Sequence, residues 1–231
     1  MADSETVVNE LLDRESVITG IQRRLAAEGN FQPFITVSRE PGSGGRPIAK
    51  EVARLLGLKF YDKRLIERAA EKFHTSVGVL TRVDERRRSG VMDLVQSMFN
   101  PDYVSDEKYF RILSQIILKL VSKGGVVILG RGANFVTPNA FGLEVQIVAP
   151  YRVRVARAVQ YEHLSYLDAR RVIRDVSADR AAYVKQYFGK DIGLPKYYDL
   201  TLNTTFYSVS QAAKIIVSAY KAKFPGGKIR V

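Results

Sequence analysis

The sequence predicts a three-layer α/β fold, in which helices cover both faces of a parallel sheet. Short apolar segments alternate with longer amphipathic segments along the chain, as parallel strands alternate with their crossover helices. Residues 126–129 (VVIL) are apolar without interruption, which is typical of a strand buried on both faces. A chain of 231 residues that is 46% hydrophobic can bury such a core and carry a smaller elaboration.

The individual elements follow from hydrophobic spacing and from the residues that begin or end helices. Apolar residues at helical spacing predict an N-terminal helix over residues 4–27, which packs on the domain or on a second subunit. Pro47 favours the start of the next helix, because the missing proline N–H needs no partner there. The predicted strands are 34–37, 58–61, 126–129, 143–148 and 199–203, and the other predicted helices are 62–73, 77–85, 106–122, 151–161, 165–187 and 208–224.

These elements divide the chain into three parts. The main domain is predicted over residues 31–224, after a helical extension (1–30) and before a flexible tail (225–231). Inside the domain, residues 86–107 are irregular and predict a cover or a mobile insert. Residues 150–190 are rich in arginine and predict a lid region.

The composition indicates which partners the chain has. Lysine and arginine number 36 against 24 aspartates and glutamates, and the net charge of +12 indicates an anionic partner or a solvated basic surface. No apolar run approaches the ~20 residues of a membrane helix, and the acidic N-terminus lacks a secretory signal, so we expect a cytoplasmic protein that does not bind membranes. The absence of cysteine excludes disulfides, and two distant histidines predict no metal site built by the protein alone.

A glycine-rich turn, Gly42-Ser43-Gly44-Gly45, separates the first core strand from its helix. Backbone amides of such a turn can close on an anion, and the helix N-terminus adds partial positive charge. We therefore expect Gly42, Ser43, Gly44, Gly45, Arg46 and Pro47 to form a phosphate-binding loop. A plain turn between strand and helix is the alternative.

This turn departs from the standard G-x-x-x-x-G-K-[ST] pattern. When the two are aligned on Gly44, Arg39 replaces the first glycine and Gly45 replaces the lysine. We expect Arg46 or Arg39 to supply the missing charge, because guanidinium is a permanent cation with a planar fork that clamps phosphate oxygens. A dinucleotide-binding pattern fits less well: Asp62 lies where a ribose-binding carboxylate would, but Pro47 takes the third glycine position.

Further arginines follow the buried strand and fill the predicted lid. Arg131 comes just after the strand 126–129, at the sheet edge where open α/β folds bind ligands. In the helix 165–187, Arg174 and Arg180 point in different directions unless the helix breaks between them, and a break would let the segment close as a lid. Pairing of some arginines with neighbouring aspartates is the alternative.

Four separated blocks together resemble the cytidylate kinase-like family of P-loop nucleoside monophosphate kinases, over roughly residues 34–217. The blocks are ITVSREPGSGGRPIA (35–49), FYDKRLIERAA (60–70), VVILGRGANFV (126–136) and DRAAYVKQYFGKDIGLPKYYDLTLNT (179–204). The resemblance implies a P-loop kinase fold with a helical lid, a cover insert and an additional N-terminal helix. It also implies ATP-dependent phosphorylation of a nucleoside monophosphate or a similar small acceptor, with Mg²⁺.

The resemblance assigns roles to residues outside the loop. It places Asp62 on the acceptor side, Arg131 against the acceptor phosphate, and Asp199 near the base of a nucleotide. It places Arg171, Arg174 and Arg180 in the lid, with Asp179 beside them. The chain departs from true cytidylate kinases in two ways: the loop lysine is absent, and the family's GRD is here Gly130-Arg131-Gly132. No Ser or Thr stands at position 47 for Mg²⁺, so Ser43 or water would serve.

Two other functions compete with a kinase. The missing lysine favours a nucleotide-binding regulatory module with little catalysis. The net charge alone favours a nucleic-acid-binding protein, but no recognised nucleic-acid-binding motif accompanies it. The sequence therefore predicts a nucleotide or a small phosphorylated acceptor as partner, with nucleic acid disfavoured and a homodimer through the N-terminal helix as an option.

Overall fold

The computed structural model describes residues 4–66 and 106–230. Its centre is a parallel sheet of five strands in the order β3-β4-β2-β5-β6, which confirms the predicted fold class. The predicted helix 77–85 and almost all of the predicted insert 86–107 lie outside the described residues. The strands are β2 (Phe34–Arg39), β3 (Lys59–Tyr61), β4 (Val126–Leu129), β5 (Gly142–Val148) and β6 (Leu200–Asn203).

Two helices cover one face of the sheet. These are α2 (Gly45–Leu56) and α9 (Val209–Lys223), and they pack on each other and on alternate residues of the strands. Ile35 and Val37 of β2 point into this layer, where they meet Val52 of α2 and Ile216 of α9. The alternation follows from the pleat, which sends successive side chains to opposite faces.

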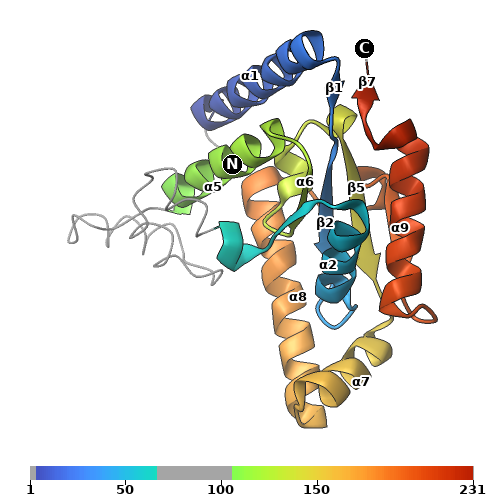
Figure 1. Cartoon of the computed structure of the whole chain (residues 1–231). Helices are drawn as coiled ribbons and strands as arrows, with labels where there is room; N and C mark the ends of the chain where they lie inside the picture. Colours follow the sequence, from blue (N-terminus) through green and yellow to red (C-terminus); the bar gives the residue numbers. More distant parts are fainter. Residues whose placement is uncertain (1–3, 67–105, 231) are drawn as a thin grey trace.

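The other face is covered by α1 (Ser4–Glu28), α5 (Asp106–Ser122) and the short α6 (Ala133–Val136). Figure 1 shows α1 lying beside α5, and Arg24 of α1 donates to the main-chain oxygens of Ser122 and Lys123 at 3.2 and 3.0 Å. Val17, Ile21 and Leu25 of α1 belong to the same hydrophobic core as α5. This part of the N-terminal helix therefore packs on its own domain.

Helices α7 (Tyr151–Glu162) and α8 (Tyr166–Phe188) extend beyond the end of the sheet where the β2–α2 connection lies (Figure 1). They pack on each other through Val155 and Ala158 of α7 and Ala169 and Ile173 of α8. Helix α8 is continuous, so the break that we considered between Arg174 and Arg180 does not occur. The alanine, valine and arginine residues of this stretch all continue the helical hydrogen bonding. The helix ends at Gly189.

The C-terminal tail is more ordered than the sequence predicts. Residues Pro225–Gly227 form a 3₁₀ turn, and β7 (Ile229–Arg230) pairs antiparallel with β1 (Asn30–Phe31). The pairing partner lies far away in the sequence, which explains why local composition predicts a flexible end. Short 3₁₀ turns lie at Asn139–Phe141 and Pro195–Tyr197, and residues 63–66 are helical. Across residues 4–66 and 106–230, every helix is too short or too polar to traverse a bilayer.

A buried carboxyl group lies in the first half of β5. Glu144 is only 6% exposed, and its main-chain N–H donates to Asp199 Oδ2 at 2.8 Å. Burial and, to a lesser extent, the negative charge of Asp199 raise the pKa of Glu144 from its ordinary value of 4.5 to about 7. Positive charges lower the same pKa, and they come from Lys223, Arg14 and Lys190. Glu144 is therefore costly to ionise in the folded protein.

We predict that Glu144→Gln stabilises the protein at pH 8. The folded state binds a proton on Glu144 between pH 4.5 and about 7 while the unfolded chain has lost it, so the free energy of unfolding falls as pH rises through that window. The glutamine variant lacks this penalty and should gain about 1–3 kcal/mol at pH 8, since one pKa unit corresponds to about 1.4 kcal/mol. Urea denaturation at pH 5 and pH 8 measures the difference, with the exposed Glu28→Gln as control. Equal pH dependence in wild type and Glu144→Gln would contradict the prediction.

Candidate active site

The glycine-rich connection between β2 and α2 lies at the carboxyl end of the central strand. Strand β2 ends at Arg39, and α2 begins at Gly45, two residues earlier than Pro47. The first N–H groups of a helix have no partner within it, and the helix dipole makes that end positive. A cavity of about 380 Å³ opens beside this connection. Its lining includes Arg39, Glu40, Gly42, Gly44, Gly45, Arg46, Pro47, Asp62, Lys63, Arg64, Glu162 and Arg180.

Helix α7 fixes the start of the connection. The Glu40 carboxylate accepts from the Ala149 N–H at 2.9 Å and lies 3.4 Å from the Arg154 guanidinium. Gly42 has φ +75°, and a β-carbon there would lie 2.7 Å from the Arg154 main-chain oxygen. The loop can thus pack against α7 only with glycine at position 42.

Helix α7 also fixes the middle of the loop through a second arginine. Arg157 Nη1 lies 3.3 Å from the Ser43 oxygen and 2.9 Å from Thr204 Oγ1, and its Nη2 donates to the Thr204 oxygen at 2.7 Å. The Thr204 hydroxyl in turn donates to the Ser43 oxygen at 2.8 Å. The carbonyl of Ser43 is thereby bonded on the side of β6.

A second cavity, of about 510 Å³, opens on the other side of the same loop. Arg157, Tyr161, Thr204, Tyr207 and Val209 line it together with Gly42, Ser43 and Gly44. Aromatic and aliphatic walls with a few polar groups are typical of pockets for flat organic ligands. The loop therefore separates a cationic cavity from a more apolar one.

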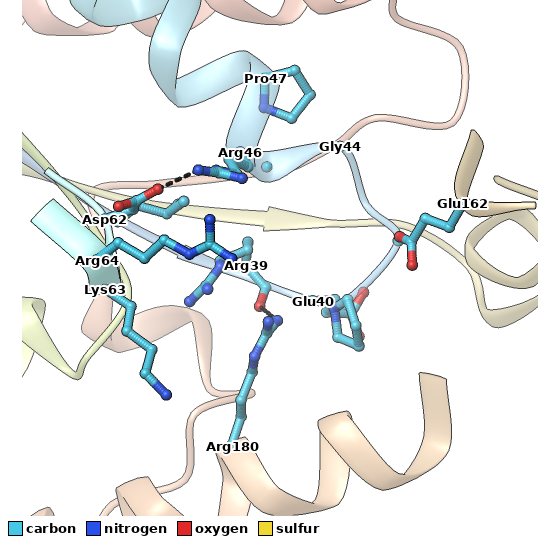
Figure 2. A pocket seen from close by; sticks show the side chains of 14 residues that line it. Arg39, Glu40, Gly44, Arg46, Pro47, Asp62, Lys63, Arg64, Glu162 and Arg180 are labelled. Atoms are coloured by element: carbon cyan, nitrogen blue, oxygen red, sulfur yellow. Dashed lines mark hydrogen bonds and ion pairs between the residues drawn. The ribbon is translucent and has the colours of Figure 1, made fainter. Parts of the chain in front are cut away.

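Arg46 and Asp62 form an ion pair across the first cavity, as Figure 2 shows. Arg46 Nη2 lies 2.5 Å from Asp62 Oδ2, and the Arg46 side chain is 57% exposed. Asp62 is mostly buried and also accepts from the Leu65 N–H at 3.2 Å, so it caps the helix that begins after it, as the sequence predicts. The pair joins the first turn of α2 to the end of β3.

Arg180 reaches from α8 back to β2. Its Nη1 donates to the main-chain oxygen of Arg39 at 2.8 Å (Figure 2). Arg39 and Arg180 line both the first cavity and a smaller one of about 30 Å³. The smaller cavity is also lined by Arg131 and Asp179, so α8 and the carboxyl ends of β2 and β4 meet there.

Arg131 lies in a left-handed turn directly after β4. Gly130, Arg131 and Gly132 have φ values of 80°, 61° and 63°, and Arg131 is 7% exposed. A positive φ is unusual for arginine and accompanies functional turns more often than ordinary ones. A β-carbon on Gly132 would collide with the Phe188 ring. An aspartate at position 132, as in the GRD pattern, would therefore require the Phe188 ring to move.

Three of the sequence-predicted residues lie elsewhere. Arg171 pairs with Asp168 at 2.7 Å and Arg174 with Asp175 at 3.1 Å, and both arginine side chains are mostly exposed on α8. Asp199 precedes β6, at the opposite end of the strand from the loop, where it bonds Glu144 and Lys223. The structure does not bring these residues to the cavities at the β2–α2 loop.

Sequence reasoning missed several residues at the site. Arg154, Arg157 and Thr204 hold the loop, and Lys63, Arg64 and Glu162 line the first cavity. Arg154 and Arg157 stand in a dense run of arginines, but their spacing gives no indication that they contact the loop. The run Asp62-Lys63-Arg64 at the carboxyl end of β3 is the signal that would have indicated a cationic wall.

A parallel sheet whose central strand leads through a glycine loop into a helix N-terminus, beside a cationic cavity, defines a P-loop kinase type of protein. The chain belongs to the cytidylate kinase-like family, whose model matches residues 34–206. This membership supports a nucleotide-dependent kinase as the general class of activity.

Individual relatives agree with the family. The cytidylate kinase of Desulfurococcus amylolyticus is 27% identical over 80% of this chain and 90% of its own length. The cytidylate kinase of Pyrococcus horikoshii is 27% identical over 84% of this chain and 91% of its own length. A crystal structure of an uncharacterized protein from Eubacterium ventriosum superposes with a TM-score of 0.62, at 20% identity, over 81% of this chain and 97% of its own, which supports the fold.

We predict that Thr204→Val loosens the loop. Valine keeps the shape of the buried threonine but removes the hydroxyl that bonds the Ser43 oxygen and accepts from Arg157. Without the Thr204 hydroxyl, the Ser43 oxygen and the Arg157 guanidinium each lose a hydrogen-bond partner, which should lower the free energy of unfolding by about 1–3 kcal/mol. Thermal and urea denaturation measure the loss. Thr205→Val, which removes a hydroxyl bonded to Asn203, should change stability by about 0.5 kcal/mol or less; an equal effect of both variants would show that the Thr204 bonds do not hold the loop.

Proposed function

We propose that the protein transfers a phosphoryl group from ATP to a nucleoside monophosphate resembling CMP, or to a similar small acceptor. The observation that carries this proposal is the glycine loop at the N-terminus of α2, which opens into a cavity lined by Arg39, Arg46 and Arg180. Phosphoryl transfer depends on positioning and on neutralising charge, and both features serve those needs.

In this proposal the loop holds the phosphates of ATP, and the 510 Å³ cavity takes its nucleoside. The amides of the turn Gly42–Gly45 provide hydrogen bonds to phosphate oxygens. Tyr161, Tyr207 and Val209 offer apolar surface to a purine on the far side of the loop. One molecule can then occupy both cavities, because the loop lines each of them.

The acceptor is placed between the first cavity and the small one. Arg131 and Arg180 offer guanidinium groups to an acceptor phosphate, with Asp179 beside them. Asp62 and Arg46 lie on the β3 side of the same space. The crowding at Gly132 argues that the acceptor is bound without the aspartate of the GRD pattern, so its sugar contacts differ from those of cytidylate kinases that keep it.

The residues at the loop fit a magnesium ion that is held by phosphate oxygens and water. Within the described parts of the chain, no three His, Asp or Glu side chains gather as a metal cluster. Ser43 is fully buried, and its hydroxyl donates to the Glu40 oxygen at 2.8 Å, so water is the better candidate ligand. Mg²⁺ commonly keeps several waters and would neutralise phosphate charge.

A nucleotide-binding regulatory module is the alternative, and the absence of the loop lysine favours it. A thermal-shift screen of nucleotides with Mg²⁺ identifies ligands, and multiple-turnover release of ADP with a panel of nucleoside monophosphates then separates the two functions. Turnover with any acceptor supports the kinase. Tight ATP binding without turnover on the whole panel would favour the regulatory module.

We predict that Arg180→Ala lowers kcat/KM by about 10²–10³-fold, which is the usual effect of removing one charged donor from a transferring group. The coupled assay with the best acceptor measures it. Arg174→Ala is the matched comparison, because it removes an arginine from the exposed surface of the same helix and should change kcat/KM by less than about twofold. Equal losses in the two variants would mean that α8 acts as a whole and that Arg180 has no special role.

A further inference from the structure

The β2–α2 loop shows an exchange between two positions of the standard phosphate loop. The standard loop has glycine at its first position and lysine six residues later. Here the first position is Arg39 and the lysine position is Gly45. A cation and a glycine are present in both cases, with their places interchanged.

The structure gives a steric reason for this exchange. A β-carbon on Gly45 would lie 2.5 Å from the Cβ and 2.8 Å from the Cγ of Arg39. Both β-carbons are fixed by the backbone, so a change of rotamer cannot relieve the overlap. Only one of the two positions can carry a side chain, and a lysine at position 45 requires glycine at position 39.

The Arg39 side chain runs from the end of β2 toward the end of β4. Its Nη1 is so close to Gly130 that a β-carbon there would collide with it. The guanidinium therefore lies at the carboxyl end of β4, and Arg39 lines both the 380 Å³ cavity and the small cavity with Arg131. A group at the boundary of the two cavities is placed to meet a phosphate that passes from one to the other.

Arg46 is less suited to replace the lysine. Its guanidinium lies 2.5 Å from the Asp62 carboxylate, on the β3 side of the cavity, and its side chain is more than half exposed to solvent. Arg39, by contrast, begins in the space that the β-carbon of a lysine at position 45 would need, and its guanidinium reaches Gly130 at the end of β4.

We propose that Arg39 is the phosphate-binding cation of this loop, so that a strand residue performs the role of the absent lysine. The inference deepens the proposed function and rests on ATP binding at this loop. A guanidinium suits the position because its planar fork can bond two phosphate oxygens at once while keeping a permanent charge.

The test compares binding of ATP with Mg²⁺ and binding of adenosine, by calorimetry, in a set of variants. Arg39→Ala should weaken ATP binding at least tenfold and adenosine binding less than twofold, because only the phosphates contact Arg39. Arg39→Lys should retain more ATP affinity than Arg39→Ala, since it keeps a charge. Arg54→Ala, on the exposed side of α2 beside Glu51, is the matched control and should leave both affinities within twofold of wild type.

The reciprocal variant Arg39→Gly/Gly45→Lys is the sharpest test. It should bind ATP at least tenfold more tightly than Arg39→Gly alone, whereas Gly45→Lys alone should fold poorly or bind more weakly than wild type. A double variant that binds no more tightly than Arg39→Gly would overturn the exchange. If the double variant does not fold, the comparison of Arg39→Lys with Arg39→Ala decides: equal affinity for ATP would overturn the proposal.

The outcomes separate this inference from the proposed function. If the wild-type protein binds no ATP, both the proposed function and the role of Arg39 are rejected. ATP binding that Arg39→Ala leaves unchanged removes the role of Arg39 alone. Parallel loss of ATP and adenosine binding in Arg39→Ala would show that Arg39 only supports the fold, which also overturns the proposal.

Discussion

The β-carbon of Arg39 and the backbone of Gly45 approach so closely that β2 and α2 share space for one side chain where they meet. Because this space is filled from the strand, position 45 carries no side chain, and together with Gly42 and Gly44 it leaves much of the turn as bare backbone whose amides can meet an anion. Those amides are useful only if the carbonyls of the turn are bound elsewhere. Arg157 and Thr204 bond the Ser43 carbonyl, and the Glu40 carboxylate ties the start of the turn to the Ala149 N–H just before α7.

The parallel sheet brings the other groups of the site together. All its strands end at one edge, so Arg39 at the end of β2, Asp62 after β3 and Arg131 after β4 lie near one another although the chain separates them widely. Helix α8 adds Arg180 from the far side, and its continuity decides which arginine arrives. Residues one turn and more away on the same helix, such as Arg174, lie on its outer surface and pair with neighbouring carboxylates.

Hydrophobic spacing was sufficient to predict the layers of the fold, and 106–122 and 126–129 match α5 and β4 residue for residue. Hydrophobic spacing was insufficient where an element or a hydrogen bond depends on residues that are far apart in the sequence. The β1–β7 pairing and the bond from Arg157 to Thr204 join residues far apart in the sequence, which local patterns cannot register. The assignment of Asp199 to the base of a nucleotide came from the family resemblance alone. Asp199 precedes β6 and so lies at the amino end of that strand, away from the carboxyl ends where open α/β sheets bind ligands. The glycine loop and Asp62 were recognisable because their residue types are themselves unusual in that context.

The left-handed turn at Gly130–Gly132 links the end of β4 to the end of α8. Because the ring of Phe188 occupies the place of a side chain at position 132, a larger residue there requires the ring to move or to be replaced by a smaller side chain. A variant of this protein with an acidic residue after Arg131 would therefore need a second change near the end of α8. The composition of the turn after β4 and the aromatic packing of α8 thus constrain each other.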